Sequence, residues 1–217
     1  MRVIITGAGG ALGQAVLERY RQAGAQVAAL CRHPIKGADE TRIHAVNLAD
    51  EAEADAAIGS AVRLLGGVDA YVHLAGAFVW EKVQGGDPSS WRAMFEANVG
   101  TAVSCARALL PHMERGSIVF VGAQAAQRAA AGFGAYAASK SGVARLTEAL
   151  AEETGPKIRV NAVLPLIIDT PRNRADMPDA DPSHWTTPAA IADAIHFLTT
   201  DAARAINGAL VPVTHPA

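Results

Sequence analysis

A tyrosine and a lysine stand four residues apart, at Tyr136 and Lys140, in the stretch AYAASK. In a helix this spacing places both side chains on one face, one turn apart. An ammonium group beside a phenol favours the phenolate, so we expect Lys140 to lower the pKa of Tyr136 from about 10. A tyrosine adjusted in this way exchanges a proton near neutral pH. The pair predicts a proton-handling site.

A glycine-rich loop lies near the start of the chain, where ITGAGGALG follows the apolar run RVIIT. Its glycines allow a tight turn and a close approach of the backbone to a pyrophosphate, and they are Gly7, Gly9, Gly10 and Gly13. The helix that should follow offers free N–H groups and the positive end of its dipole. In this context the loop predicts a dinucleotide site, and tight packing alone is the alternative.

The residues after the second apolar run should choose the cofactor. An acidic residue there would bind the adenosine ribose of NAD, but the chain reads Cys31-Arg32-His33. An arginine at this place pairs with a 2′-phosphate. Arg32 therefore favours NADP, with NAD and a solvated surface arginine as the alternatives.

The elements that must position these residues alternate in type. We expect strands at 2–6, 26–31, 42–46, 68–76, 117–122, 157–165 and 209–213. We expect helices at 11–24, 50–65, 88–113, 134–154 and 187–200, with Asp50 as the N-cap of the second and an irregular segment at 166–187. This alternation predicts an α/β fold, a single doubly wound Rossmann-type parallel sheet with helices on both faces, formed by residues 1–217 as one domain.

Composition fits this fold and excludes several classes of protein. Hydrophobic residues make up 50% of the 217 positions and charged residues 18%, which argues against disorder. A net charge of −2 favours neither nucleic acid nor an anionic membrane. No run of apolar residues reaches the roughly 18 that a membrane span needs. We expect Cys31 and Cys105 to be reduced thiols and the protein to be cytoplasmic.

With these pieces in place, the chain resembles the short-chain dehydrogenase/reductase family over nearly its whole length. The matching segments are Thr6-Gly7 to Gly13 with Ala11 in place of a glycine, Asn47-Leu48, HLAG at 73–76, Asn98, and Tyr136 with Lys140. The resemblance implies a catalytic set of Tyr136, Lys140 and Asn98. It implies a cofactor groove formed by Gly7, Gly9, Gly10, Leu12, Gly13, Arg32, Asn47, Leu48, Ala75, Gly76, Tyr136, Lys140, Pro165 and Thr170.

The chain departs from this family at the catalytic serine. The family places that serine thirteen positions before the tyrosine, which is Ala123 here. A narrower resemblance accounts for the change, because dihydropteridine reductases also carry Gly-Ala at this place. They share the string D-T-P-x-N-R-x-x-M-P-x-A-D-x-x-x-W, found here at 169–185. They differ in having an aspartate at the position of Cys31, in favouring NADH, and in lacking the asparagine kept here as Asn98.

The missing serine bears on the substrate. Loss of one donor to a developing oxyanion typically costs about 10²–10³ in rate. An electron-poor ring such as a quinonoid dihydropterin accepts hydride readily and mainly needs stacking, orientation and a proton, which Tyr136 can supply. We therefore expect an NAD(P)H-dependent reductase of such acceptors. The alternatives are carbonyl or alcohol chemistry, with water or Gln124 replacing the serine, and a cofactor-binding sensor without turnover.

The segment 166–187 should form a lid over the substrate. The resemblance implies that Thr170 reaches the nicotinamide carboxamide. Candidates for covering a flat ring are Met177, Trp185, Phe78 and Trp80, although each could instead be core or interface packing. Arg172, Arg174 and Asp169 should form salt bridges. We expect no metal site, because His73, His112 and His196 lack ligand spacing.

The resemblance also bears on assembly. In this family the helices that correspond to 88–113 and 134–154 pack subunits together, which implies a homodimer or a homotetramer. We expect the remaining partner to be a small-molecule substrate.

Overall fold

The computed structural model of the protein describes residues 1–32, 42–44 and 47–216, and its centre is one parallel sheet. Within these residues, seven strands pair in the order β3-β2-β1-β4-β5-β6-β7, and each of these pairings is parallel. The strands are β1 (Arg2–Thr6), β2 (Gln26–Cys31), β3 (Arg42–His44), β4 (Ala70–His73), β5 (Gly116–Val121), β6 (Ile158–Pro165) and β7 (Leu210–Val213). The predicted fold class is confirmed. Residues 45–46 of the predicted third strand lie outside the described residues.

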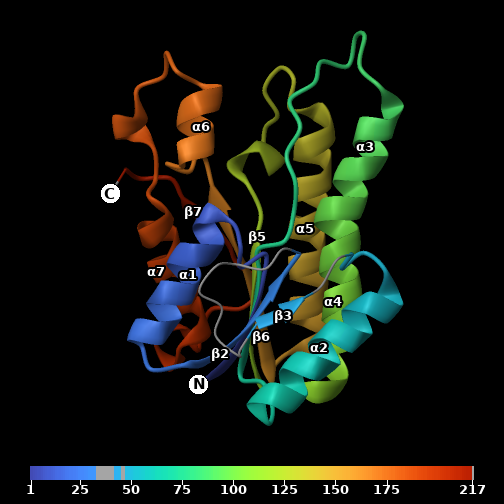
Figure 1. Ribbon diagram of the computed structural model, residues 1–217, viewed down its shortest axis with the longest axis vertical. Coiled ribbons are helices and arrows are strands. Elements are labelled where there is room, and N and C mark those ends of the chain that lie inside the picture. Colours follow the sequence, from blue (N-terminus) through green and yellow to red (C-terminus); the bar gives the residue numbers. More distant parts are fainter. Residues whose placement is uncertain (33–41, 45–46, 217) are drawn as a thin grey trace.

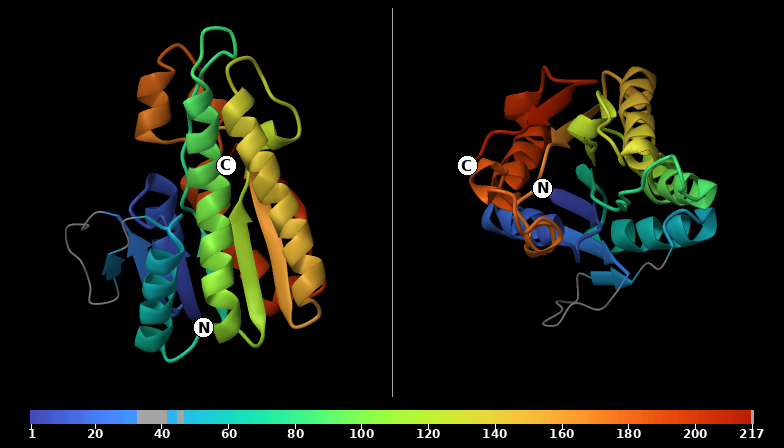
Figure 2. Two further views of the ribbon diagram at one scale, coloured as in Figure 1. Left: turned by 90° about the vertical axis from the view of Figure 1, so that its right-hand side faces the viewer. Right: turned by 90° about the horizontal axis from the view of Figure 1, so that it is seen from above.

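Helices cover both faces of the sheet, as Figure 1 and the view from above in Figure 2 show. One layer contains α1 (Ala11–Gln22) and α7 (Pro188–Thr199), whose apolar side chains share a core cluster with those of the strands. The other layer contains α2 (Glu51–Leu65), α4 (Thr101–Leu109) and α5 (Gly134–Thr154). Asp50 caps α2 as predicted, accepting a hydrogen bond from the Glu53 N–H at 2.9 Å.

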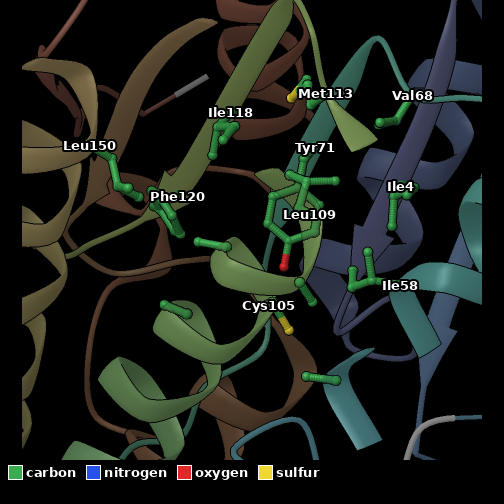
Figure 3. Close-up of a cluster of buried hydrophobic side chains, with 14 of the residues drawn as sticks. Ile4, Ile58, Val68, Tyr71, Cys105, Leu109, Met113, Ile118, Phe120 and Leu150 are labelled. Carbon is green, nitrogen blue, oxygen red and sulfur yellow. The ribbon is translucent and has the colours of Figure 1, made fainter. Parts of the chain in front are cut away.

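Buried side chains form one core cluster on each face of the sheet, which explains why apolar and polar residues do not alternate along the central strands. Tyr71, Phe120 and Ile4 are fully buried and pack against α2 and α4 (Figure 3). Their neighbours in β1, Val3 and Ile5, are equally buried but belong to the cluster on the opposite face. Burial of one large apolar side chain contributes roughly 1.5–3 kcal/mol. Residues that are apolar on both faces therefore fix β1 in the middle of the sheet.

The order of the strands reverses its direction at β1, which lies between β2 and β4. The chain builds outward from β1 through β2 to β3, then returns to β4 on the other side of β1. In open parallel sheets, ligands bind at the carboxyl ends of the strands where this reversal occurs. The loops after β4 and β5 and the lid segment all rise at this end of the molecule (Figures 1 and 2).

Two segments differ from their predicted structure. The predicted helix at 88–113 is broken into α3 (Pro88–Phe95), a π turn (Glu96–Gly100), α4 and a 3₁₀ turn (Leu110–His112). The π turn is stabilised by side-chain bonds that a sequence pattern does not show. The segment at 166–187 is not wholly irregular, because Pro171 opens α6 (Pro171–Asp176) and Pro182 opens a 3₁₀ turn (Pro182–His184). Further 3₁₀ turns are Gln124–Ala126 and Asp201–Ala203.

Candidate active site

The backbone around the turn between β1 and α1 is packed so closely that only glycine fits at Gly7 and at Gly13. Gly7 has a φ of +65°, and a Cβ on it would stand 2.7 Å from the backbone of Leu74. A Cβ on Gly13 would stand 2.5 Å from the Gly7 carbonyl oxygen. The glycines predicted to form a tight turn between strand and helix therefore lie where the backbone segments touch.

The N-terminus of α1 is open above this loop. Its N-cap is Gly10, which supplies no side-chain acceptor, and no acidic residue occupies the first turn. Gly9 and Gly10 are exposed, and Leu12 is half-buried. Free N–H groups and the positive end of a helix dipole bind phosphate oxygens. These residues therefore fit the pyrophosphate of a dinucleotide.

The residues expected at the adenosine end follow β2 and β3. Leu30 of β2 pairs with Thr6, so Arg32 leaves the sheet beside the phosphate loop. The Arg32 side chain is exposed and makes no hydrogen bond or ion pair to another described residue. Asn47 Oδ1 accepts a hydrogen bond from the Ala49 N–H at 3.1 Å, and Leu48 is buried. His33 lies outside the described residues.

Asn98 lies in the π turn, and its carboxamide is fully hydrogen-bonded. Oδ1 accepts from the Ala77 N–H at 3.0 Å. Nδ2 donates to the Ala77 carbonyl at 3.1 Å and to Ser139 Oγ at 2.9 Å. A Cβ on Gly76 would stand 2.5 Å from Asn98 Oδ1, so the loop after β4, with Ala75 and Gly76, lies directly against this side chain. Asn98 therefore connects that loop to α5.

Ser139 completes this connection, and the sequence analysis did not identify it. Its side chain is fully buried, and its Oγ donates to the Tyr136 carbonyl at 2.7 Å while it accepts from Asn98. The only signal in the sequence was a serine within a predicted helix. A buried serine in a helix needs a nearby acceptor for its hydroxyl proton.

Lys140 lies one turn beyond Tyr136 on α5, as predicted, and its amine is buried. Nζ donates to the Val121 carbonyl at the end of β5 at 2.8 Å. The residue is 7% exposed, and burial lowers the pKa of its amine to about 8. Nζ lies 5.9 Å from the centroid of the Tyr136 ring.

The expected effect of Lys140 on Tyr136 is wrong. Burial raises the pKa of Tyr136 to about 12, whereas we expected the ammonium to lower it. The cause is that Lys140 Nζ hydrogen-bonds the Val121 carbonyl and stands apart from the phenol, so the desolvation of a phenolate dominates. Tyr136 is therefore a protonated phenol at neutral pH, which suits a proton donor.

Ala123 occupies the position thirteen residues before Tyr136, and no hydroxyl replaces it nearby in the chain. Ala123 is 4% exposed and follows β5 by two residues. A Cβ on Gly122 would stand 2.4 Å from Leu164 Cδ2, so a side chain at the preceding position would require the end of the Leu164 side chain to move. Gln124 follows at the start of the 3₁₀ turn, and its side chain makes no hydrogen bond to another described residue.

Aromatic rings surround the Tyr136 ring. Phe78, from the loop after β4, meets it edge-on with ring centroids 4.9 Å apart. Phe133 lies 5.4 Å from Phe78, and a Cβ on Gly132 would stand 2.4 Å from the Trp80 ring. Phe78 and Trp80 are 54% and 55% exposed. The sequence indicated Phe78 and Trp80 but not Phe133, whose signal was its i, i+3 spacing from Tyr136.

The lid segment is held partly by side-chain caps and ion pairs. Thr170 caps α6, its Oγ1 accepting from the Asn173 N–H at 3.1 Å, and Pro165 is buried at the end of β6. Arg174 forms two hydrogen bonds with Asp169, at 2.6 and 2.8 Å.

One expectation for the segment 166–187 requires correction. Arg172 pairs with Asp176 at 3.4 Å and Arg174 with Asp169, so the expected salt-bridge set is two separate pairs. Trp185 is only 6% exposed, which agrees with the alternative of core packing, and Met177 is half-buried. A hollow of about 580 Å³ is lined by Trp185, Asp169 and Arg174 among others, and neither Tyr136 nor Lys140 lines it.

The other reactive side chains lie apart from this site. Cys31 and Cys105 are buried free thiols. Among the described residues, no group of three or more His, Cys, Asp and Glu side chains is arranged to hold a metal ion. None of the helices in the described parts of the chain combines the length and the apolar character that crossing a membrane requires.

Comparisons with known proteins agree with this geometry. The family model described as short chain dehydrogenase matches residues 1–181. A 2,3-dihydroxy-2,3-dihydro-p-cumate dehydrogenase from Pseudomonas putida is 31% identical over 182 residues, covering 77% of this chain and 70% of that protein.

Two solved structures add cofactors. A 3-ketoacyl-(acyl-carrier-protein) reductase from Brucella melitensis, complexed with NADH, has a TM-score of 0.85 at 26% identity, covering 97% of this chain and 95% of its own. A short chain dehydrogenase from Shigella flexneri, complexed with NADP, has a TM-score of 0.87 at 25% identity, covering 97% and 96%. The chain described here belongs to the short-chain dehydrogenase/reductase family and is an NAD(P)-dependent oxidoreductase.

Proposed function

We propose that this protein reduces an electron-poor ring, such as a quinonoid dihydropterin, with NAD(P)H as the hydride source. The observation that carries the proposal is the buried alanine at position 123, preceded by Gly122 and therefore by another residue without a hydroxyl. A carbonyl substrate gains from a hydroxyl donor at its developing oxyanion. A ring that accepts hydride readily depends on that donor much less.

Tyr136 is the proton donor in this proposal. Its raised pKa keeps the phenol protonated at neutral pH, as an acid must be before it reacts. The bound nicotinamide supplies the hydride. Phe78 and Phe133 pack edge-on against the phenol ring.

Lys140 and Asn98 hold the rest of the catalytic set. The amine of Lys140 has three donors, and one of them is used by the Val121 carbonyl. We assign the others to the nicotinamide ribose and to a water held near Asn98, which would link Lys140 to solvent. A lysine with a pKa of about 8 returns a proton to its partners near neutral pH more readily than an exposed lysine.

The cofactor groove runs from the phosphate loop to the lid in this proposal. Gly7, Gly9, Gly10, Leu12 and Gly13 hold the pyrophosphate. Asn47 and Leu48 flank the adenine, Ala75 and Gly76 line the centre, and Pro165 and Thr170 meet the nicotinamide.

We also propose a preference for NADP. Arg32 is exposed just after β2, where we expect it to meet a 2′-phosphate, and the neighbouring Cys31 offers no carboxylate to a ribose hydroxyl. Arg32→Ser should raise the KM for NADPH roughly tenfold and leave that for NADH within about twofold, since one charge-assisted pair is worth about 1.5 kcal/mol. An equal rise in the KM for NADPH and for NADH would show that Arg32 does not distinguish the two cofactors.

The substrate side is apolar. Phe78 and Trp80 present more than half of their surface and could stack a flat ring, and the lid at 166–187 would close over it. The segment belongs to one NAD(P)-binding domain of residues 1–217. By analogy with the family we place the protein in the cytoplasm as a homodimer or homotetramer.

A second candidate function is reduction of ordinary ketones, with Gln124 as the donor in place of serine. It is favoured by the side chain of Gln124, which follows Ala123 directly and has no hydrogen-bond partner among the described residues. Gln124→Leu would then abolish ketone reduction and spare pterin reduction.

The test is oxidation of NADPH and of NADH by the purified protein against quinonoid dihydropterin, a ketone panel and a quinone panel. Enzyme-free controls are needed, because these acceptors also react with the free cofactor. Fast turnover of the pterin or a quinone supports the proposal. Turnover of ketones alone favours the second candidate, and tight cofactor binding without any turnover indicates a sensor.

A further inference from the structure

A histidine that the reaction does not touch lies at the end of β4. His73 is 3% exposed, and both of its ring nitrogens have partners. Nδ1 lies 2.7 Å from the Tyr71 hydroxyl and 3.2 Å from Thr6 Oγ1. Nε2 lies 3.1 Å from Thr101 Oγ1. The side chain therefore joins β1, β4 and α4 in the core.

The proton on each of these groups follows from its partners. Thr101 Oγ1 donates its only proton to the Ala97 carbonyl at 2.8 Å, so it must accept from His73 Nε2–H. Nδ1 is then unprotonated and accepts from the Tyr71 hydroxyl. The Tyr71 hydroxyl lies toward the helix that carries Cys105 (Figure 3).

This chain of hydrogen bonds ends in the π turn beside Asn98. In the π turn the Thr101 N–H bonds to the Glu96 carbonyl, so it does not satisfy the Ala97 carbonyl as it would in an α-helix. The Thr101 hydroxyl donates a hydrogen bond to the Ala97 carbonyl instead. The next residue after Ala97 is Asn98, whose carboxamide holds the loop after β4 and Ser139.

The other end of the chain reaches the phosphate loop. Thr6, the last residue of β1, lies 3.2 Å from His73 Nδ1 and accepts from the N–H groups of Leu74 and Ala75 at 3.2 Å each. A single imidazole therefore contacts both the strand that leads into the cofactor loop and the turn that holds Asn98.

We propose that His73, as a neutral imidazole protonated at Nε2, is a positioning residue for Asn98, acting through the Thr101 hydroxyl on the Ala97 carbonyl. The imidazole fixes the direction of the hydroxyl, the hydroxyl donates to the Ala97 carbonyl that the Thr101 N–H does not bond, and the turn places the Asn98 carboxamide. The inference rests on the catalytic role proposed above for Asn98.

The kinetic test compares two isosteric substitutions. Thr101→Val removes the hydroxyl but keeps the side-chain volume. Thr147→Val is the matched control, because Thr147 is also buried and its Oγ1 donates to the carbonyl four residues earlier, at 2.9 Å, but it has no histidine partner. We expect Thr101→Val to lower kcat roughly tenfold with NADPH affinity within about twofold, and Thr147→Val to leave kcat near that of wild type. Equal losses of kcat in both variants would overturn the proposal.

A double variant tests whether His73 acts through Thr101. His73→Phe should lower kcat by a similar factor, and adding Thr101→Val to it should lower kcat no further. Multiplied losses in the double variant would show that the two residues act independently.

An NMR measurement needs no turnover. The ¹⁵N spectrum of the wild-type imidazoles should show a His73 ring protonated at Nε2 and bare at Nδ1, and the side-chain amide resonances of Asn98 should move in Thr101→Val but not in Thr147→Val. The opposite tautomer, or unmoved Asn98 resonances, would contradict the proposal. The NMR result tests the hydrogen bonds from His73 through Thr101 to Asn98 even if the protein reduces no pterin. Failure of the positioning proposal can therefore be told apart from failure of the proposed function.

Discussion

The two groups of side chains around Tyr136 are opposite in character. Asn98, Ser139 and Lys140 are buried and polar, and each makes a hydrogen bond of 3.1 Å or less. The second group consists of Phe78, Phe133 and Ala123, and none of these side chains has a polar atom. The first group holds the catalytic set in place, and the second leaves the phenol of Tyr136 without a neighbouring donor.

This difference indicates where the chemistry depends on the protein. In the proposed reaction, the hydrogen-bonded group should lose function when its geometry is disturbed, because its members orient one another. We propose that the apolar group selects the substrate by shape and leaves the supply of a proton to Tyr136. The following predictions test this division, beginning with the largest effect.

Removing the phenol hydroxyl should have the greatest effect. Tyr136→Phe keeps the ring and its edge contact with Phe78 but removes the acid, so we expect kcat for pterin reduction to fall by about 10²–10⁴. Steady-state NADPH oxidation measures this, and the Kd for NADPH should change by less than about threefold. Full activity in the variant would mean that water or another residue supplies the proton.

The buried amine of Lys140 should make stability depend on pH. Its pKa is about 8 when folded and about 10.5 when unfolded, so between these values the unfolded chain binds a proton that the folded chain does not. Stability therefore rises with pH in this window. The free energy of unfolding of the wild type, relative to Lys140→Met, should increase by roughly 2 kcal/mol from pH 8 to pH 10.

Urea denaturation of both proteins across that range measures the difference. Below pH 8 the amine is protonated in both states, and the two stability curves should run parallel. Curves that stay parallel up to pH 10 would show that the folded amine has an ordinary pKa.

Truncating an aromatic ring should have a smaller effect and act mainly on binding. Phe78→Ala should raise the KM for pterin by about tenfold and change kcat by less than about threefold, because a stacked aromatic pair is worth about 0.5–1.5 kcal/mol. Phe197→Ala is the control, since Phe197 is 44% exposed and lies on α7. A large fall in kcat for Phe78→Ala would assign Phe78 to orientation of the phenol.

Restoring a hydroxyl at position 123 should have the smallest effect on pterin reduction. We expect Ala123→Ser to change kcat/KM for the pterin by less than about threefold and to raise that for a ketone by more, because only the ketone develops an oxyanion that needs the donor. A tenfold gain with the pterin would show that the apolar group had limited this reaction too.

Much of the fold followed from the sequence because the signals were local. The strands of the sheet, the Asp50 cap and the glycine turn each depend on a few adjacent residues. The π turn did not follow, since it depends on bonds from Asn98 and Thr101 to residues that are distant in the chain or hidden within one helix.

In the candidate site, too, some features follow from local sequence patterns and others depend on contacts between distant residues. The placement of Tyr136 and Lys140 on one face of α5 follows from their spacing. Ser139, Phe133 and His73 have functions that arise only from contacts made across the fold, and the pKa of Tyr136 depends on burial that no pattern shows. The direction of the Lys140 amine toward the Val121 carbonyl is the contact that reversed the expected pKa shift.

The most direct test of the account is rapid mixing of the wild-type protein, loaded with NADPH, with quinonoid dihydropterin, while the nicotinamide absorbance is followed. If a site without a hydroxyl at position 123 transfers hydride to an electron-poor ring, one NADPH per subunit is oxidised much faster than in the enzyme-free mixture. Oxidation at the enzyme-free rate would contradict the account.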